Sequence, residues 1–447
     1  MKTLKLLIVI ILLAAFFSTI AYCQTLDSVA RGQTVDMLKN VKNSIKKDYY
    51  DEKFGGIDLD ARFAIAEEKL KSVTSLGQAF AVIAQTVMDL NDSHTRFFPP
   101  STNHIVEYGL RMKIVGKKAF ITGIMPGSDA EKNGLKVGDE ILKLNGFSPT
   151  REELWKMIYY YYTLNPQTKL TLEVKDPEGQ IKQLEAKAKV TVLKHVVSFY
   201  NSIDFAEALR EGDRRSDSQE HYFKEIGNSL IWKMPSFVFD PADVPNLIAR
   251  ARSKQFLILD LRGNGGGYVD TLEKLAGYFF EKDTKIADLK GRKKLDPQMA
   301  KSEGKNGFGG NLIILIDSAS GSASEIFARL MQIEKRGIVL GDRSAGAVMQ
   351  SKGLKFDAGV TTSISYGMNL TMADVIMTDG KSLEHIGVEP NLVVLPSGED
   401  LANRRDPALA AALELTGNKM DASAAGNIFP VEKFVERRSN FALRIDF

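Results

Sequence analysis

Ser322 is the residue of this chain whose surroundings best suit nucleophilic chemistry. It lies in the segment Gly-Ser-Ala-Ser-Glu at positions 321–325, shortly after the apolar run Leu312–Ile316. That run is short, rich in β-branched residues and free of polar ones, which predicts a strand buried on both faces. Apolar residues then recur at helical spacing, at Ile326, Phe327, Leu330 and Met331. The pattern therefore places Ser322 where a buried strand turns into a helix.

A serine at such a junction has two interpretations. Backbone N–H groups at the start of a helix lack helical partners and lie at the positive end of the helix dipole, so they can stabilise an oxyanion beside a nucleophile. Ser322 and Glu325 also match a capping box, in which the serine only stabilises the start of the helix. The motif alone leaves both interpretations open.

A second chemical feature is the glycine run in Arg-Gly-Asn-Gly-Gly-Gly at positions 262–267, which follows the strand-like Phe256–Asp260. Glycines allow backbone amides to approach a reacting group closely. Gly266 or Gly267 is a candidate donor to an oxyanion, with the Ala323 amide as the second donor. A tight turn without a catalytic role is the alternative. The run is not a dinucleotide fingerprint, which would need glycine at position 268, and no P-loop follows it.

A serine nucleophile needs a base, and the histidines are the first candidates. The five histidines are His94, His104, His195, His221 and His385, and their scattered positions give no metal-ligand spacing, so we expect neither a metal nor a cofactor. His94 is the best candidate because it follows an amphipathic helical segment, is flanked by Asp92 and Ser93, and precedes a double proline. A surface or capping role is its alternative.

Composition limits the class of protein. The chain has 447 residues, 44% hydrophobic and 26% charged, with a formal net charge of +3. This is ordinary globular material, long enough for two or three domains, and gives no reason to expect a nucleic-acid partner.

The pattern of residues at the N-terminus is typical of a targeting segment. Lys2 and Lys5 precede an apolar run at residues 6–17, which predicts a signal peptide and an exported, periplasmic or extracellular protein. Cleavage after Cys23 would remove the only cysteine and exclude disulfides. A lipid anchor on Cys23 is the alternative, disfavoured by the bulky Tyr22, and would make the chain a membrane-anchored envelope protein.

Three regions follow the leader. Residues 27–90 show helical periodicity, and the double proline at 99–100 is expected to start a linker. Residues 126–146 predict a turn, a short helix, a second glycine turn and a strand closed by Asn145-Gly146, and this stretch resembles a bacterial protease-associated PDZ domain. The resemblance implies capture of a peptide C-terminus, with Tyr108, Gly109 and Leu110 in the carboxylate loop. A module that only braces its neighbours is the alternative.

From residue 189 onward, buried strands such as 226–233 and 256–260 alternate with helices, which predicts parallel β-α-β units. Five motifs then occur in order: DSHT at 92–95, the PDZ stretch, LDLRGNGGG at 259–267, GSASE at 321–325 and GVEPN at 387–391. This order resembles the tail-specific (C-terminal processing) and tricorn-type serine peptidases.

The resemblance implies an α/β fold, with a crotonase/ClpP-like peptidase core, an N-terminal helical region and an inserted PDZ domain. The implied division is a signal peptide at 1–23, helices at 24–102, PDZ at 103–188, peptidase core at 189–420 and a tail at 421–447.

The family has two catalytic branches, and the sequence favours one. In the Ser–Lys branch a lysine would stand where this chain has Ala347, while Lys352 and Lys355 lie out of register. In the tricorn-like branch a histidine from the helical region is the base and a glutamate near the C-terminal end completes the site. The matching residues are His94, with Ser93 before it, and Glu384; Glu325 and Glu389 are competing acids.

We therefore expect an exported serine endopeptidase that acts on peptides or proteins through an acyl-enzyme. A catalytically inactive, PDZ-containing peptide-binding scaffold is the alternative. A retinoid-type ligand carrier on the same fold is a more distant one.

Overall fold

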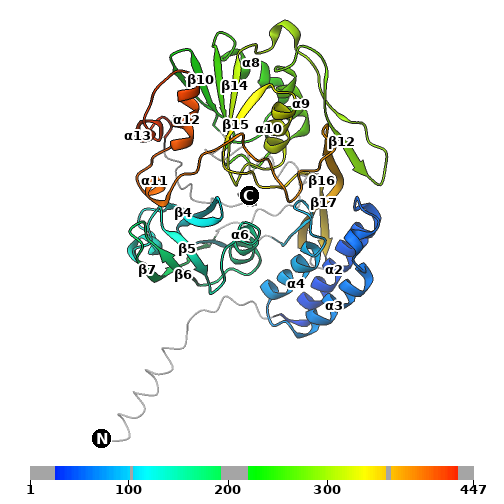
Figure 1. The fold of residues 1–447 in the computed structure, drawn as a ribbon. Coiled ribbons are helices and arrows are strands. Elements are labelled where there is room, and N and C mark those ends of the chain that lie inside the picture. The colour runs from blue at the N-terminus through cyan, green and yellow to red at the C-terminus, as the bar shows by residue number, and fades with distance from the viewer. Residues whose placement is uncertain (1–25, 101–103, 193–219, 359–363, 431–447) are drawn as a thin grey trace, which may run out of the picture.

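The computed structural model describes residues 26–100, 104–192, 220–358 and 364–430. The predicted signal peptide lies outside these ranges, as do His195 and the C-terminal tail from residue 431. Within the described ranges no helix is both long enough and apolar enough to cross a membrane. Figure 1 shows an α/β body at the top, a β-rich module at the lower left and the N-terminal helices at the lower right.

Three helices form the N-terminal region, as the periodicity predicts. They are α2 (Ser28–Asp48), α3 (Leu59–Ser72) and α4 (Leu76–Met88), and a short 3-10 turn, η1 (Phe54–Gly56), lies between the first two. Each of the three helices is capped at its N-terminus by a side chain that accepts a hydrogen bond from a backbone N–H of the first turn. The capping residues are Asp27, Asp58 and Ser75. Their apolar faces share one buried cluster with residues of a neighbouring sheet.

The body is built on a six-stranded sheet in the order β18-β15-β14-β11-β10-β9. Its strands are β9 (Tyr222–Ile226), β10 (Ser229–Lys233), β11 (Phe256–Asp260), β14 (Asn311–Ile316), β15 (Gly337–Gly341) and β18 (Leu392–Val393). All neighbouring pairs are parallel except β9 with β10. The predicted strand at 226–233 is therefore two strands, because Gly227 adopts a positive φ of 56° and starts a turn.

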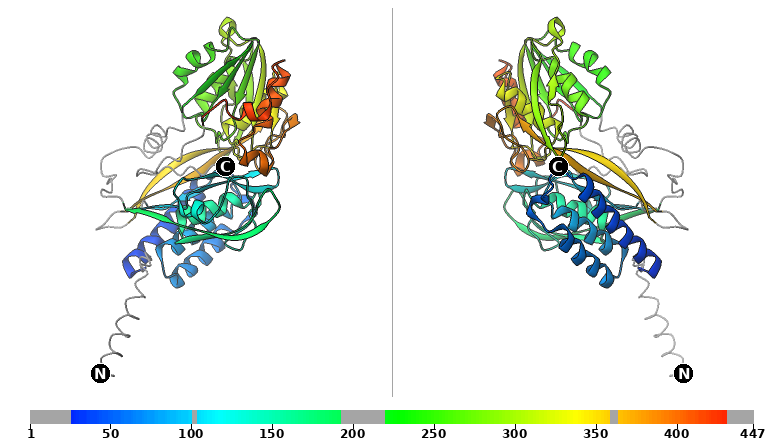
Figure 2. Two further views of the ribbon diagram at one scale, coloured as in Figure 1. Left: turned by 90° about the vertical axis from the view of Figure 1, so that its left-hand side faces the viewer. Right: turned by 90° about the vertical axis from the view of Figure 1, so that its right-hand side faces the viewer.

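Helices cover both faces of this sheet, which explains its unbroken apolar strands (Figure 2). Ile314 of β14 faces α8 (Val244–Ala249), α9 (Val269–Gly277) and α10 (Ala323–Ile333). Its neighbour Leu315 faces α12 (Pro407–Leu415) and α13 (Ala422–Ala425) on the other side. The predicted α/β fold class is confirmed.

A second sheet joins the body to the N-terminal helices. It contains β1 (Arg96–Phe98), β12 (Thr284–Gly291), β13 (Gln298–Ala300), β16 (Met349–Ala358) and the long β17 (Ile364–Met377). Phe97 of β1 pairs with Met368 of β17, and both are buried against α2–α4. The residues just before the double proline are thus a sheet strand, which the sequence did not predict.

The β-rich module has a five-stranded sheet in the order β3-β4-β5-β6-β7. Its elements are β3 (Leu110–Val115), β4 (Lys118–Ile124), α5 (Asp129–Lys132), β5 (Glu140–Leu144), β6 (Lys169–Lys175) and β7 (Ile181–Lys187). Asn145 and Gly146 both have positive φ and close the predicted two-residue turn between Leu144 and Phe147. A ribbon of β2 (His104–Glu107) and β8 (Lys189–Val192) leads into and out of the module.

The remaining elements are short. Between β5 and β6 lie α6 (Leu154–Tyr159) and a π-helical turn, η2 (Tyr160–Leu164). The body also contains η4 (Pro241–Asp243), η5 (Gly304–Asn306) and α11 (Gly398–Ala402). The domain boundaries predicted from the sequence stay predictions.

Candidate active site

Ser322 lies at the junction that the sequence predicts, between the end of β14 at Ile316 and the start of α10 at Ala323. Its backbone has φ 51° and ψ −115°, an unusual conformation for a residue with a side chain. Such a conformation costs about 1–3 kcal/mol and persists only where the surrounding structure enforces it.

The buried carboxylate of Glu325 supplies much of that enforcement. Its Oε2 accepts hydrogen bonds from the backbone N–H groups of Ser322 at 3.0 Å and Ala347 at 2.9 Å. Its Oε1 accepts from Gly346 N–H at 2.7 Å and from Ser344 Oγ at 2.6 Å. Burial raises the pKa of Glu325 to about 7, against these hydrogen bonds, which lower it. Glu325 thus ties the nucleophile turn to the segment 344–347.

A chain of hydrogen bonds connects the predicted base to the predicted acid. Ser93 Oγ lies 2.7 Å from His94 Nδ1 and donates to Glu384 Oε2 at 2.8 Å. The Ser93 N–H also donates to Glu384 Oε1 at 2.7 Å. Because the hydroxyl has one proton and gives it to the carboxylate, it must accept from His94 Nδ1–H. In that tautomer His94 Nε2 is unprotonated, as a general base requires.

One peptide unit links this chain to the nucleophile turn. The carbonyl of Ala347 accepts from Ser322 N–H at 2.9 Å, and the following N–H, of Val348, donates to Glu384 Oε2 at 2.9 Å. Ser322 and Glu384 are therefore bonded to opposite ends of the same peptide group. A continuous series of hydrogen bonds thus links four residues predicted from the sequence, Ser322, Glu384, Ser93 and His94.

Burial shifts the pKa of both titrating partners toward their neutral forms. Desolvation lowers the pKa of His94 to about 4, opposed by the charge of Asp92 and reinforced by that of Arg96. Desolvation also raises the pKa of Glu384, opposed first by its hydrogen bonds from Ser93 and Val348. A neutral imidazole at neutral pH is the state in which His94 can accept a proton.

The histidine loop is positioned by residues that the sequence analysis did not assign. Asp92 Oδ1 accepts from the N–H groups of His94 at 2.8 Å and Thr95 at 2.7 Å, and from Thr371 Oγ1 at 2.6 Å. An aspartate bonded to amides two and three residues ahead is a turn pattern, so Asp92 had a local signal. His385 Nε2 contacts the Asn91 carbonyl at 2.7 Å. Neither Thr371 nor His385 had such a signal, because both contacts cross more than 270 residues.

The glycine loop lies against the nucleophile turn. A Cβ on Gly266 would come within 2.7 Å of Ser322 Cβ and 2.9 Å of Ala323 N, so only glycine allows this approach. The Gly266 N–H is already donated to Asn264 Oδ1 at 2.9 Å. In the described part of the chain, neither Gly267 N–H nor Ala323 N–H appears as a hydrogen-bond donor. The geometry therefore favours Gly267 over Gly266 as the partner of Ala323 in an oxyanion hole.

The competing lysines and the competing acid Glu389 have other surroundings. Lys352 Nζ forms an ion pair with Asp48 of α2 at 3.0 Å, and Lys355 is exposed on β16. The Glu389 side chain is 69% exposed and lies 3.8 Å from Arg343. Among the described residues, no group of three or more His, Cys, Asp or Glu side chains could hold a metal ion.

The residues predicted for peptide capture lie in the β-rich module. Tyr108 is buried and its hydroxyl donates to the Gln167 carbonyl at 2.8 Å, so its side chain is structural. Gly109 has φ 72°. Leu110 begins β3, which among the described residues pairs with β4 alone and so forms an edge of its sheet. An edge strand has the unpaired backbone groups that strand addition by a peptide requires.

Contacts also join the β-rich module to the loop before Ser322. Lys113 of β3 forms an ion pair with Asp317, and Ser318 Oγ donates to the Ile114 carbonyl. Arg151 donates to Asp342 Oδ2 and to the Gly116 carbonyl, both at 2.8 Å. The module is therefore held against the segments that follow β14 and β15.

The structure has an α/β body with a candidate serine site and a separate β-rich module. Comparison with known proteins agrees with this architecture. Residues 231–394 match the model of peptidase family S41, and residues 105–153 match that of the PDZ domain. The chain thus contains a region similar to peptidase family S41 and a region similar to the PDZ domain, as its motifs indicate.

Two curated relatives are similar over most of the chain. The tail-specific protease of Haemophilus influenzae is 24% identical over 344 residues, which cover 71% of this chain and 46% of that protein. The chloroplastic carboxyl-terminal-processing peptidase 1 of Arabidopsis thaliana is 24% identical over 349 residues, which cover 74% of this chain and 66% of that protein. The chain thus spans about half the length of the first relative.

Two solved structures share the fold. Mature CPAF complexed with lactacystin has a TM-score of 0.61 at 15% identity, covering 84% of this chain and 96% of that one. The photosystem II D1 C-terminal processing protease has a TM-score of 0.50 at 16% identity, and the match covers 88% of this chain and 99% of that one.

A stability series tests the part played by Glu325. Glu325→Leu should lower the free energy of unfolding by about 3 kcal/mol or more, because each buried donor left without a partner costs about 1–3 kcal/mol. Glu325→Gln should lower the free energy of unfolding by a smaller amount. The new amide NH₂ can donate to Ser344 Oγ, and only the Gly346 N–H then faces another donor. Urea denaturation followed by circular dichroism measures both.

The contribution of Glu325 to the free energy of unfolding should depend on pH in a defined direction. The pKa of Glu325 is raised from 4.5 to about 7 in the folded chain. Its contribution to stability is therefore present below about pH 4.5 and is lost as the pH rises through 7. Glu325→Gln should not show this loss. The exposed Glu334, at the end of α10, provides the control Glu334→Gln; equal stability of Glu325→Leu and this control would contradict the assignment.

Proposed function

We propose that the chain is a serine endopeptidase that cleaves peptide bonds through an acyl-enzyme, with Ser322 as nucleophile and His94 as base. The observation that carries this proposal is the hydrogen-bonded series from His94 through Ser93 to Glu384, which is bonded to the same peptide unit as Ser322. The relatives named as processing proteases support it.

The chemistry follows from the groups present. His94 Nε2 accepts the proton of Ser322 Oγ as that oxygen attacks the carbonyl carbon of the substrate. The N–H groups of Ala323 and Gly267 stabilise the resulting oxyanion. His94 then gives the proton to the leaving amine, and a water molecule, deprotonated by His94 in turn, releases the acyl group from Ser322.

Ser93 and Glu384 set the tautomer of His94 and stabilise its protonated form. Ser93 accepts the Nδ1–H and so keeps the imidazole in the tautomer whose Nε2 is unprotonated. When His94 becomes positively charged, the carboxylate of Glu384 stabilises that charge through the intervening hydroxyl. This serine between base and acid replaces the direct acid–histidine contact of simpler triads.

Two further parts of the proposal rest on the sequence. We propose that residues 1–23 direct export, on the basis of Lys2, Lys5 and the apolar run that follows. We also propose that the PDZ domain captures substrate C-termini beside β3. The alternative of an inactive scaffold is disfavoured because a scaffold has no need of a poised base, an acid and strained nucleophile geometry in one place.

Replacement of the nucleophile tests the core of the proposal. Ser322→Ala should reduce peptide hydrolysis by roughly 10⁴-fold or more and abolish fluorophosphonate labelling, because the acyl-enzyme can no longer form. The exposed Ser72→Ala is the matched control and should label and hydrolyse like the wild type. Near-wild-type hydrolysis by Ser322→Ala would remove Ser322 from the site.

The pH profile tests the base. His94 must be neutral to accept a proton, so activity should fall as the pH drops below the pKa of His94 and its coupled partner. Because burial lowers the pKa of His94 to about 4, the acid limb of kcat/KM should lie below the ordinary histidine pKa of about 6.5.

His94→Ala should be nearly inactive at every pH, whereas Lys352→Ala should keep its activity. An active His94→Ala protein together with an inactive Lys352→Ala protein would show that the chain uses the lysine branch of the family.

Peptide capture is tested with the full chain carrying Ser322→Ala, so that peptides are bound and not cleaved. A peptide with an apolar C-terminal residue and a free carboxylate should bind at least about tenfold more tightly than its amidated twin, because the amide loses the charge-assisted hydrogen bonds. Fluorescence anisotropy measures both affinities. Equal affinities would indicate that the PDZ domain is a brace or recognises internal sequence.

A further inference from the structure

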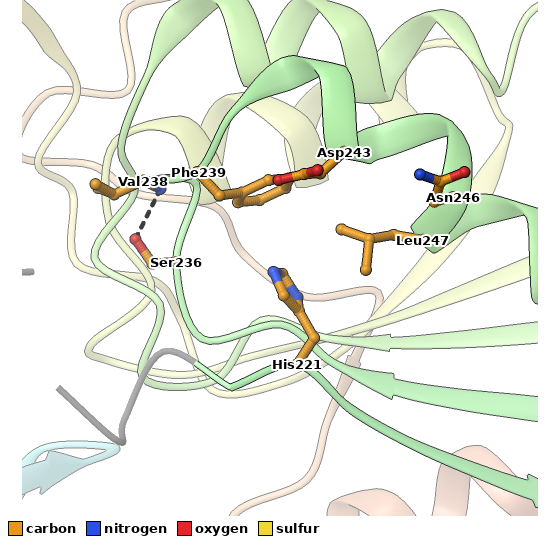
Figure 3. Close-up of a pocket in the computed structure, with 7 residues that line it drawn as sticks. All are labelled: His221, Ser236, Val238, Phe239, Asp243, Asn246 and Leu247. Carbon is orange, nitrogen blue, oxygen red and sulfur yellow. Dashed lines mark hydrogen bonds between the residues drawn. The ribbon is translucent and has the colours of Figure 1, made fainter. Parts of the chain in front are cut away.

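Two histidines outside the proposed mechanism have side-chain contacts of very different kinds. His221 is directed into a cavity of about 260 Å³ between the start of β9, the turn η4 and the start of α8 (Figure 3). Its Nδ1 accepts from Trp232 Nε1 at 3.1 Å, and no hydrogen bond in the described part of the chain joins its side chain to the residues of the mechanism. His385 directly follows Glu384 in the sequence and contacts two parts of the candidate site.

The backbone of His385 is bonded to the segment that also accepts the Ser322 N–H. His385 has φ 61°, in the left-handed region, and its N–H donates to the Gly346 carbonyl at 2.8 Å. A Cβ on Gly346 would lie 3.1 Å from the carbonyl carbon of His385, so the two backbones are closely packed. The Gly346 N–H in turn donates to Glu325 Oε1 at 2.7 Å. The position of His385 is therefore set by the same short stretch of backbone as that of Ser322.

The side chain of His385 reaches the loop that carries the proposed base. Its Nε2 lies 2.7 Å from the Asn91 carbonyl oxygen. Because a carbonyl oxygen can only accept, Nε2 must carry a proton and donate it. Asn91 has φ 52° and directly precedes Asp92, whose carboxylate accepts the His94 N–H at 2.8 Å. The His385 hydrogen bond therefore acts on the backbone immediately before the residues that hold His94.

The loop that carries His94 is thus held from two sides. On its buried side, Thr371 Oγ1 of β17 donates to Asp92 Oδ1 at 2.6 Å. On its exposed side, His385 donates to the Asn91 carbonyl. Without the second contact, the bonds from Ser93 would have to hold the loop against Glu384 while the same hydroxyl also accepts from His94. The contact of His385 relieves Ser93 of that additional requirement.

His385 also lies close to the proposed acid. Its Nε2 is 3.6 Å from Glu384 Oε1, which is too far for a hydrogen bond but close enough for an electrostatic interaction. Burial raises the pKa of Glu384, and the hydrogen bonds from Ser93 and Val348 and the charge of His385 oppose that shift. One imidazole nitrogen is therefore within reach of both the base loop and the acid.

We propose that His385 is a positioning residue for the peptidase reaction, and that the hydrogen bond from its Nε2–H to the Asn91 carbonyl holds the loop of His94 in place beside the loop of Glu384. The inference rests on the proposed function and adds one residue to the machinery of that site. His385 acts through His94 and carries no proton in the mechanism.

The test compares two amide side chains of different reach in the full-length protein. The amide nitrogen of glutamine lies about as far from the backbone as histidine Nε2, whereas the asparagine side chain is one carbon shorter. His385→Asn should lower kcat and the rate of fluorophosphonate labelling by about tenfold each with KM unchanged, because the base is no longer aligned. His385→Gln should keep both within about threefold of the wild type. Asparagine tolerates a positive φ, so the loss would not come from backbone strain.

Controls separate positioning from general stability. His385→Gly suits the positive φ and has no donor, so it should behave like His385→Asn. The exposed Lys381 lies in the same loop, and Lys381→Gln should leave kcat and KM unchanged. Thermal unfolding followed by circular dichroism shows whether each variant is folded. If His385→Asn does not fold, His385→Gly decides.

The outcomes distinguish this inference from the peptidase proposal. Active wild-type protein whose asparagine and glutamine variants have the same kcat, whether normal or reduced, would overturn the role of the Nε2–H donor and leave the peptidase proposal intact. A raised KM with normal kcat in His385→Asn would overturn it as well. Wild-type protein that neither labels nor cleaves would overturn both proposals.

Discussion

The candidate site depends on how two buried carboxylates hold one stretch of backbone. Glu325 accepts the N–H groups of Gly346 and Ala347, and Glu384 accepts that of Val348. These acceptors come from different elements, one from the first turn of α10 and the other from the loop after β17. The Ala347 carbonyl in this stretch also accepts the Ser322 N–H, so Ser322, Glu325 and Glu384 are all bonded to the same short segment of backbone. A buried carboxylate is costly unless it is saturated with donors, and here its donors are the backbone that must be positioned.

The parallel sheet brings the other components to that scaffold. The carboxyl ends of neighbouring parallel strands meet at one edge, so the loops after β11 and β14 are adjacent. The Leu261 N–H donates to the Leu315 carbonyl at 2.9 Å, and the Gly321 N–H donates to the Asn264 carbonyl at 3.0 Å. The glycine loop and the nucleophile turn are therefore extensions of paired strands. Their relative position is set by the sheet, and glycine at position 266 is needed because that position leaves no room for a side chain.

The PDZ domain is attached to the same edge. Its strand β3 contacts Asp317 and Ser318, which lie between β14 and Ser322, and its Arg151 reaches Asp342 after β15. Asp317 in turn accepts the Gly263 N–H at 3.0 Å. Its pKa is lowered by the charge of Lys113, against the opposing effect of burial. One ion pair thus connects the PDZ edge strand, the glycine loop and the segment before the nucleophile.

The sequence by itself determined several of the elements that surround the candidate site. The unbroken apolar run before Ser322 required burial on both faces, the glycines at 263–267 required a close backbone approach, and the turn at Asn145-Gly146 required positive φ. Each of these is a local constraint that a short window of residues expresses. The sequence also gave the order of motifs, and that order pointed to His94, Ser93 and Glu384 by resemblance.

Only the tertiary structure decided which groups meet. The Glu384 carboxylate, for example, meets the Ser93 hydroxyl across 291 residues of sequence. The peptide group between Ala347 and Val348, which is bonded to Ser322 at one end and to Glu384 at the other, has no local signature. Hydrogen bonds between distant segments, and the desolvation that shifts the pKa of His94, are properties of packing. No periodicity or motif records them.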